Sequence, residues 1–321
     1  MIKLSQDHGV SAIEMRKAYC DSLIEAAKSD SRVITVNCDL CSSMGLVPFE
    51  QAYPERGFNV GIQESNGLAV SAGLSASGMV PFFNTFAVFS SRRVFDQAFV
   101  SCAYAGLNVK IVGGDPGVSA TTNGGTHMAF EDIGLYRTVP TCRVIDPCDP
   151  VLLKAIIPQM ISHYGVDYLR LLRKAAPKIY DESSTFEIGK ANLLREGTDV
   201  TLIACGLQVY EALMAAEQLQ SEGISARVID MFTIKPIDKD CVIESAKRTG
   251  AIVTAENHNV IGGLGSAVAE VLVENCPTVM ERVGVMDEFG EVGAQDYLLD
   301  RFNLTAKTII EKAKLAVSRK G

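Results

Sequence analysis

Short runs of β-branched and aromatic residues alternate with longer helical patterns along almost the whole chain. This alternation is typical of parallel sheets covered by helices, because two parallel strands need a long crossover between them. The predicted strands lie at Arg32–Val36, Phe58–Ile62, Val80–Asn84, Val109–Gly113, Arg143–Asp146 and Tyr168–Leu172, then at Asp199–Ala204, Ala226–Asp230, Ala251–Ala255 and Thr278–Val285. The predicted helices between them lie at Ser11–Ala27, Phe89–Ala105, Pro150–His163, Val209–Glu222, Asp238–Thr249 and Gly262–Glu274.

The chain is long enough for two domains. It has 321 residues, and globular chains average one domain per roughly 150 residues. The segment Ala175–Gly197 is polar, contains Pro177 and has weak periodicity, so we expect it to be the linker, with a boundary near residue 185. The predicted fold class is therefore α/β, with two doubly wound, mostly parallel-sheet domains at 1–185 and 186–321.

Composition excludes several classes of protein. Apolar residues make up 47% and charged residues 21%, which does not fit a disordered or fibrous chain. The net charge is −8 and no basic cluster offsets it, so we expect neither nucleic acid nor an anionic membrane as a partner. The amino terminus has no secretory pattern, and the most apolar window, residues 68–83, is interrupted by serines, glycines and Pro81. Nine scattered cysteines suit reduced thiols, which indicates a cytoplasmic protein.

Two local motifs leave alternatives open. Cys38 and Cys41 form a CxxC pair without a second ligand pair, so a redox role stays possible, although bystander thiols are favoured over it. The glycines of Gly262–Gly265 open a predicted helix and could cradle an anion, but close packing of the helix against the sheet is the favoured explanation. No GxGxxG follows the first strand, and no GxxxxGK[ST] occurs.

Three segments that follow predicted strands carry residues suited to chemistry. Glu64 begins an apolar helix, where its carboxylate either binds a ligand or only interacts favourably with the positive amino end of the helix. Phe86 and Phe89 are three residues apart and form either part of the core or a platform for a cofactor. The loop from Gly113 to His127 is long, polar and rich in glycine, as functional loops often are.

Together these segments resemble the transketolase family of thiamine-diphosphate enzymes. The stretch GIQESNGLAVSAGLSASGMVPFFNTFAVFSSRRVFDQ, the loop and HMAFED, residues 61–132, are similar to the pyrimidine-binding domain of that family. Residues 16–19 (RKAY) and 232–238 (FTIKPID) also match, the latter in the second domain. The family's GDG motif for binding diphosphate and metal is missing, since residues 114–117 read GDPG. The resemblance therefore implies the carboxy-terminal subunit of a split transketolase.

The resemblance also implies a cofactor, a partner and an assembly. The cofactor is thiamine diphosphate, with Mg²⁺ or another divalent metal held by an N-terminal subunit that carries the diphosphate-binding domain; no metal ligands are expected in this chain. The assembly is an α₂β₂ heterotetramer acting on sugar phosphates. By match, Glu64 hydrogen-bonds the pyrimidine nitrogen N1′ and His127 faces the imino nitrogen, so these two residues are the catalytic candidates. The implied cofactor-binding residues are Asp39, Ile62, Glu64, Phe86, Phe89 and His127.

Substrate contacts carry over less completely. Arg16, Ser43 and Arg173 match positions that bind the substrate phosphate, whereas Arg170 falls on the opposite strand face by alternation. Asp115 replaces a phosphate-binding histidine and Asn123 replaces an aspartate that binds a sugar hydroxyl. Both belong to the implied substrate-binding set. A carboxylate beside a phosphate is repulsive, so we expect ketol transfer from a ketose phosphate of unusual length or branching rather than from xylulose 5-phosphate.

Two other functions compete with this interpretation. The β subunit of a 2-oxo-acid dehydrogenase, or a related thiamine-diphosphate synthase, shares the two-domain build, but residues 232–238 and the pair Arg16 and Ser43 favour transketolase. A non-catalytic regulatory paralogue is disfavoured by the intact Glu64 and Phe86. A neighbouring reading frame that encodes a GDG-bearing domain would support the split enzyme.

Overall fold

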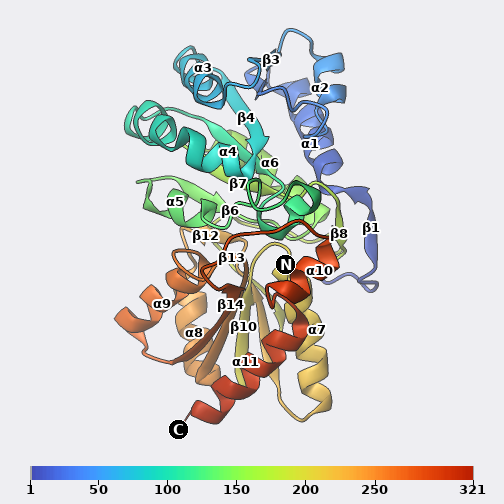
Figure 1. The fold of residues 1–321 in the computed structure, drawn as a ribbon, viewed down its shortest axis with the longest axis vertical. Coiled ribbons are helices and arrows are strands. Elements are labelled where there is room, and N and C mark those ends of the chain that lie inside the picture. Colours follow the sequence, from blue (N-terminus) through green and yellow to red (C-terminus); the bar gives the residue numbers. More distant parts are fainter. Residues whose placement is uncertain (1, 321) are drawn as a thin grey trace.

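The computed structural model describes residues 2–320, which form an elongated molecule with two sheets along its long axis (Figure 1). Within this range the first sheet has seven strands and the second has five. The order of the first sheet is β12 (Thr233–Lys235), β6 (Arg143–Ile145), β7 (Asp167–Leu171), β5 (Lys110–Gly114), β4 (Val80–Phe86), β2 (Val33–Asn37) and β3 (Gly57–Asn59). The order of the second is β14 (Val279–Val285), β13 (Ala251–Asn259), β10 (Val200–Ala204), β11 (Ala226–Asp230) and β9 (Asn192–Arg195).

Both sheets are mostly parallel, with antiparallel pairing only where β12 joins β6 and β9 joins β11 among the described strands. A separate antiparallel pair joins β1 (Val10–Glu14) to β8 (Ala175–Pro177). The helices are α1 (Met15–Ser29), α2 (Val47–Ala52), α3 (Glu64–Ala76), α4 (Ala87–Ser91), α5 (Asp132–Thr138), α6 (Pro150–Ser162), α7 (Gln208–Ser221), α8 (Lys239–Thr249), α9 (Leu264–Asn275), α10 (Gln295–Arg301) and α11 (Ala306–Arg319). Shorter helical segments are η1 (Arg92–Val94), η2 (Gln97–Tyr104) and η3 (Gly117–Asn123).

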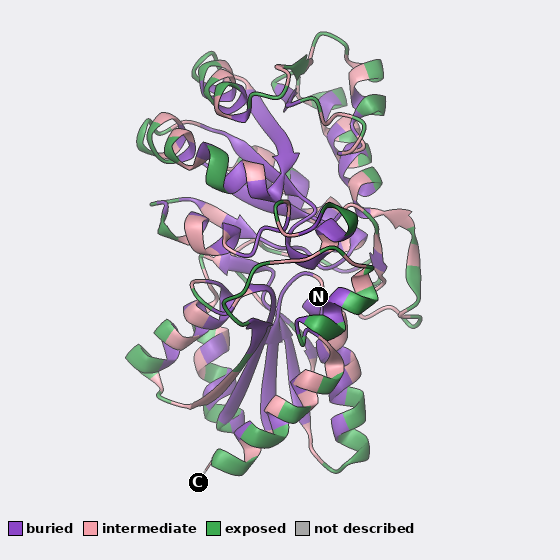
Figure 2. Cartoon of the chain, viewed as in Figure 1, coloured by how far each residue is buried: buried purple, intermediate pink, exposed green. Residues whose placement is uncertain are grey.

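Helices cover both faces of each sheet, which confirms the predicted doubly wound α/β class. Successive strand residues point to opposite faces. Phe82 accordingly packs in a cluster with α1 and α6, whereas Phe83 packs in a second cluster with α3 and η2. In the second sheet Leu202 packs with α7 and α11, and Ile203 packs with α8 and α9. The inner strands β2, β4, β5, β7, β10 and β11 are consequently buried along their whole length, and buried residues appear purple in Figure 2.

Several predicted elements are corrected by the structure. The expected helix at 89–105 is divided into α4, η1 and the π-helix η2, and the first part of the expected helix at 11–27 is the strand β1. The expected linker at 175–197 contains β8 and β9, because edge strands need little apolar periodicity. We propose a domain boundary near residue 185, between these two strands. Residues 232–238, expected in the second domain, contain an unpredicted strand, β12, which pairs with the edge of the first sheet.

The glycines at 262–265 pack closely, as favoured from the sequence. The buried Glu256 carboxylate accepts hydrogen bonds from the backbone N–H groups of Leu264 (2.7 Å) and Gly265 (2.8 Å). A Cβ added to Gly263 would lie 1.9 Å from Glu256 Oε2. The start of α9 is therefore filled by this chain's own carboxylate.

The cysteine pair offers no reactive thiolate. All nine cysteines are free, and burial raises the pKa of both Cys38 and Cys41 to about 12. Thiols of such high pKa are protonated near neutral pH and react slowly. No helix within residues 2–320 is both long and apolar enough to span a membrane.

A buried ion cluster joins the two domains. The Arg170 guanidinium on β7 donates hydrogen bonds to Asp132 (Nε to Oδ2, 2.8 Å), to Asp146 (Nη1 to Oδ2, 2.9 Å) and to the backbone carbonyl of Asn257 (2.9 Å). Asn257, on β13, in turn donates from Nδ2 to the carbonyl of Pro116 (3.0 Å) and accepts at Oδ1 from the N–H of Val118 (2.9 Å). The second domain thus holds the start of the loop that follows β5.

The buried carboxyl of Asp230 makes the stability of the fold depend on pH. Asp230, at the end of β11, accepts a hydrogen bond from the Tyr180 hydroxyl (2.5 Å) but has no partner at Oδ1. Burial raises the pKa of Asp230 from its ordinary 3.8 to about 7. Between these values the unfolded chain has released a proton that the folded chain keeps, so the free energy of unfolding falls as pH rises, by at most about 1.4 kcal/mol per pH unit.

Asp230→Asn cannot titrate at this position. We therefore expect its free energy of unfolding, measured relative to that of the wild type, to be higher at pH 8 than at pH 5. Urea unfolding at both pH values measures this gain, with the exposed Asp240→Asn as the control. An Asp230→Asn effect of equal size at both pH values would show that the carboxyl is already ionised in the folded chain.

Candidate active site

The candidate residues gather where strands of the first sheet end. Asp39 follows β2, Glu64 follows β3, Phe86 ends β4, Asp115 follows β5 and Arg173 follows β7. These strands are parallel neighbours in the order β7, β5, β4, β2, β3, so their carboxyl ends meet at one edge. Open α/β sheets bind ligands at this edge, which makes it the candidate active site.

Glu64 is the first residue of α3 and only 2% exposed. Its Oε2 accepts a hydrogen bond from Arg93 Nη1 at 2.7 Å. The Arg93 guanidinium also lies over the Phe89 ring, 4.0 Å from its centroid, which is a cation–π contact. The backbone of Arg93 is fixed as well, because its carbonyl accepts a hydrogen bond from the Ser65 hydroxyl (3.0 Å). Arg93 therefore links the buried carboxylate to the aromatic part of the site.

Three rings form that aromatic part. Phe89 and His127 lie edge to face with centroids 5.2 Å apart, and Phe86 lies 6.2 Å from His127 and 6.3 Å from Phe89. Phe86 and Phe89 come from the junction of β4 and α4, and His127 from the loop after β5. His127 Nδ1 is 2.9 Å from the Thr126 hydroxyl. The structure thus brings three predicted residues into one cluster.

A positively charged group lies beside the rings. The Arg173 guanidinium is 5.5 Å from the Phe86 centroid, and its Nε lies 3.1 Å from Asp115 Oδ2. The backbone N–H of Arg16 donates to the carbonyl of Arg173 (3.4 Å), and Arg16 Nη1 donates to the carbonyl of Ser43 (3.2 Å). Four of the five predicted substrate residues therefore lie together, with Ser43 engaged through its backbone.

Three predicted residues lie apart from these contacts. Asp39 and Ile62 are exposed, Ile62 by 72%, although one side chain, Asn59, accepts hydrogen bonds from the N–H groups of both Asp39 and Gly61 (3.0 Å each). Asn123 is also exposed, at the end of η3, and its recorded contact is with the adjacent Thr122.

The sequence interpretation missed two residues that shape the site. One of them is Arg93, which follows Phe89 by four residues. On a regular helix this spacing would predict the contact between the Arg93 guanidinium and the Phe89 ring. The helix is irregular here, so the spacing alone gives no contact with Glu64. Asn257 lies in the other domain and supports the loop after β5, for which the sequence carries no signal.

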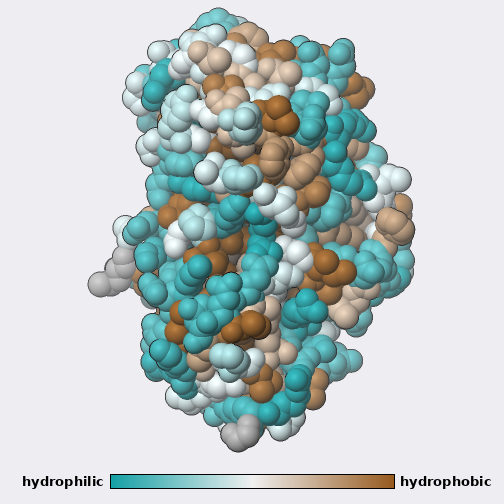
Figure 3. All heavy atoms as spheres, turned by 90° about the vertical axis from the view of Figure 1, so that its left-hand side faces the viewer, coloured by the Kyte–Doolittle hydropathy of each residue, from teal (hydrophilic) through white to brown (hydrophobic). Residues whose placement is uncertain are grey.

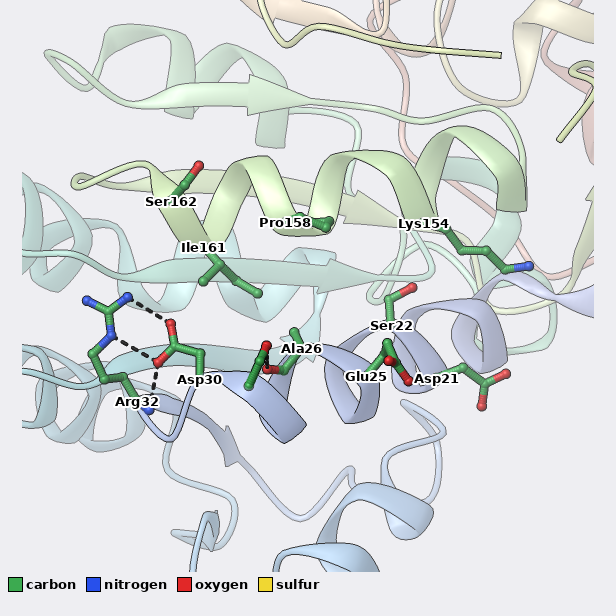
Figure 4. A pocket seen from close by; sticks show the side chains of 11 residues that line it. Asp21, Ser22, Glu25, Ala26, Asp30, Arg32, Lys154, Pro158, Ile161 and Ser162 are labelled. Atoms are coloured by element: carbon green, nitrogen blue, oxygen red, sulfur yellow. Dashed lines mark hydrogen bonds and ion pairs between the residues drawn. The ribbon is translucent and has the colours of Figure 1, made fainter. Parts of the chain in front are cut away.

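A cavity between two helices lies apart from this site. It has a volume of about 640 Å³ and lies between α1 and α6, with Asp21, Glu25, Lys154 and Pro158 in its lining (Figure 4). Helices α1 and α6 pack on the face of the first sheet opposite α3. None of the predicted site residues lines it.

Comparisons with known proteins identify the family. Residues 11–178 match the model of the transketolase pyrimidine-binding domain, and residues 189–309 match that of the transketolase C-terminal domain. The chain therefore belongs to the transketolase family, as the sequence motifs implied.

Two similar relatives are named as parts of divided transketolases. The chain is 50% identical over 306 residues to the 6-deoxy-6-sulfo-D-fructose transketolase subunit of Clostridium sp. (strain MSTE9), covering 95% of each chain. It is 36% identical to one subunit of the apulose-4-phosphate transketolase of Phocaeicola vulgatus, covering 94% of this chain and 96% of that one. A solved structure described as a split gene transketolase, inactive beta4 tetramer, superposes with a TM-score of 0.90 at 42% identity over 97% of this chain and all of the other.

Proposed function

We propose that this chain is the C-terminal subunit of a split, thiamine-diphosphate-dependent transketolase. It moves a two-carbon ketol unit from a ketose with an anionic far end to an aldose. The observation that carries the proposal is the placement of a buried carboxylate, three aromatic rings and an arginine-rich group at one sheet edge. Relatives named for sulfofructose and apulose 4-phosphate support a donor other than the common pentose phosphates.

The residues present fit the pyrimidine half of the cofactor. A flat, protonatable heterocycle needs apolar faces and an acidic partner, and Phe86, Phe89 and Glu64 offer these groups within one site. Bound there, thiamine diphosphate would supply the carbanion chemistry that no side chain can provide. In this proposal Glu64 holds a proton at the pyrimidine nitrogen N1′, His127 orients the amino group, and Asp39 and Ile62 complete the wall.

In this proposal the same site also binds the two ends of a ketose. Arg16, Ser43 and Arg173 bind the anionic end, with Asp115 beside them, and Asn123 contacts a sugar hydroxyl. With that end fixed, the ketose carbonyl is directed toward the aromatic cluster. Orientation of this kind lowers the barrier by converting an encounter into a reaction within one complex.

The proposal includes a partner subunit and a cytoplasmic α₂β₂ assembly in which the partner holds the diphosphate and its divalent metal. Apolar side chains remain exposed on the loop before α3, where Ile62 is 72% exposed, and on η2, where Val100 is 50% exposed. Figure 3 shows apolar patches in the upper half of the face that carries these elements. The free thiols suit a reducing compartment, and the relative described as an inactive beta4 tetramer supports a subunit that needs a partner.

We expect the purified chain to show no ketol transfer by itself and to gain it when the N-terminal subunit and thiamine diphosphate are added. A ketol-transfer assay across a panel of ketoses, combined with light scattering to determine the mass of each mixture, tests this expectation. Steady turnover by this chain with the partner shown to be absent would contradict the split-subunit proposal.

A further inference from the structure

Asp115 lies in the positively charged group with Arg16, Ser43 and Arg173, and the sheet fixes its position there. Strands β5 and β7 pair in parallel, with Gly114 opposite Leu171, and the backbone N–H of Asp115 donates to the carbonyl of Leu171 (3.0 Å). Asp115 has a φ of 53°, which a non-glycine residue rarely adopts unless its surroundings hold it there. Because Arg173 lies two residues beyond the end of β7, the Asp115–Arg173 pair is set by two adjacent strand ends.

Asp115 is buried with hydrogen-bonding capacity to spare. The residue is only 7% exposed, and its Oδ1 has no hydrogen-bond partner. Arg173 Nε also lacks a partner of hydrogen-bond geometry, although it lies 3.1 Å from Asp115 Oδ2. Unpartnered buried polar atoms are costly in a folded protein. A buried acceptor and a buried donor therefore stand together in the group that the proposed function gives to the anionic end of the ketose.

The charges around Asp115 nearly balance. The cations Arg16, Arg173 and Lys174 all act on its carboxylate. Arg16 is itself paired with Glu14, Nε to Oε2 at 2.7 Å, so two carboxylates oppose three cations. Burial raises the pKa of Asp115 to about 6, against the opposing effect of those cations, so the carboxyl is ionised at pH 8. The group then presents about one net positive charge.

We propose that Asp115 makes this site selective for ketoses whose far end carries one negative charge, a sulfonate, over ketoses that end in a phosphate. A phosphate monoester carries close to two charges above neutral pH, because its second pKa is about 6. A sulfonate carries one charge and is matched by the net charge of the group. The second charge of a phosphate would face the Asp115 carboxylate at short range in a poorly screened site. This inference rests on the proposed function and names the substrate class for it.

The test uses the assembled two-subunit enzyme and three ketoses that differ only at carbon 6: fructose, 6-deoxy-6-sulfofructose and fructose 6-phosphate. At pH 8 we expect the wild type to favour the sulfonate over the phosphate by at least tenfold in kcat/KM. Asp115→Asn should lower that ratio at least tenfold, mainly through a smaller KM for the phosphate. The surface variant Glu222→Gln, which removes the same charge from an ion pair with Lys314, should leave the ratio unchanged.

The outcomes separate the two proposals. An unchanged sulfonate-to-phosphate ratio in Asp115→Asn, with all three ketoses still used, would overturn the selectivity while ketol transfer stands. An equal loss of fructose and sulfofructose turnover would assign Asp115 to a sugar hydroxyl and also overturn it. If the wild type transferred no ketol, the proposed function would fail. Calorimetric binding of sulfofructose and fructose 6-phosphate to the wild type and Asp115→Asn would then decide the charge selectivity by itself.

Discussion

Glu64→Gln should lower kcat of the assembled enzyme by about 10²–10⁴-fold, the range that general acid–base groups contribute. The amide has nearly the same size as the carboxyl, but it cannot share a proton with the pyrimidine nitrogen. Its oxygen still accepts a hydrogen bond from Arg93, so fold and assembly should persist. Steady-state ketol transfer and light scattering measure the two parts of this expectation.

The matched control is Glu55→Gln, which changes an exposed glutamate beside Arg56. It should behave as the wild type in both measurements. If Glu64→Gln kept more than about a third of wild-type turnover, far above the range for an acid–base group, Glu64 would not be the residue that activates the cofactor.

Arg170→Leu should lower the free energy of unfolding by about 3–5 kcal/mol, the cost of removing one partner from a buried ion pair. The substitution leaves the buried carboxylates of Asp132 and Asp146 without their cation and removes the donor to the Asn257 carbonyl. Urea unfolding of the purified chain measures the loss. Since Asn257 holds Pro116 and Val118, ketol transfer by the assembled variant should fall as well.

Arg301→Leu provides the comparison on the surface. Arg301 pairs with Glu288 at 2.8 Å and Glu291 at 3.1 Å, but about a third of its side chain is exposed. Exposed pairs contribute about 0–1 kcal/mol, so this variant should remain close to the wild type in stability. Equal losses in the two variants would show that the interdomain cluster contributes no more than a surface pair does.

Ten strands of the two sheets could be predicted, because buried parallel strands are short β-branched runs. Each of the ten lies within a few residues of the position predicted from the sequence. Glu64, Phe86, Phe89 and His127 could be placed in one site for a related reason, since each lies at or after the end of a strand of one parallel sheet. The resemblance to transketolases added their roles, which stay predictions. The contact between Asp115 and Arg173 could not be predicted without the order of the strands. The two residues meet because β5 and β7 are neighbours in the sheet, although they are far apart in the sequence.

Other features had no signal in the sequence. Strand β12 crosses from the second domain to the first sheet through antiparallel pairing with β6. The irregular backbone through η1 and η2 turns Arg93 toward Glu64. Both depend on how distant segments pack, which local periodicity does not encode.

The contact between Arg93 and Glu64 affects how the proposed cofactor would bind. A buried carboxylate with no counter-charge would weaken the free subunit, and Arg93 removes that liability before any ligand arrives. In the proposed site, binding of the pyrimidine would therefore be an exchange at Glu64, in which a ring nitrogen would replace, or share the carboxylate with, a guanidinium that already lies over the Phe89 ring. Glu64 thus has a counter-charge within the subunit itself, before the proposed cofactor binds.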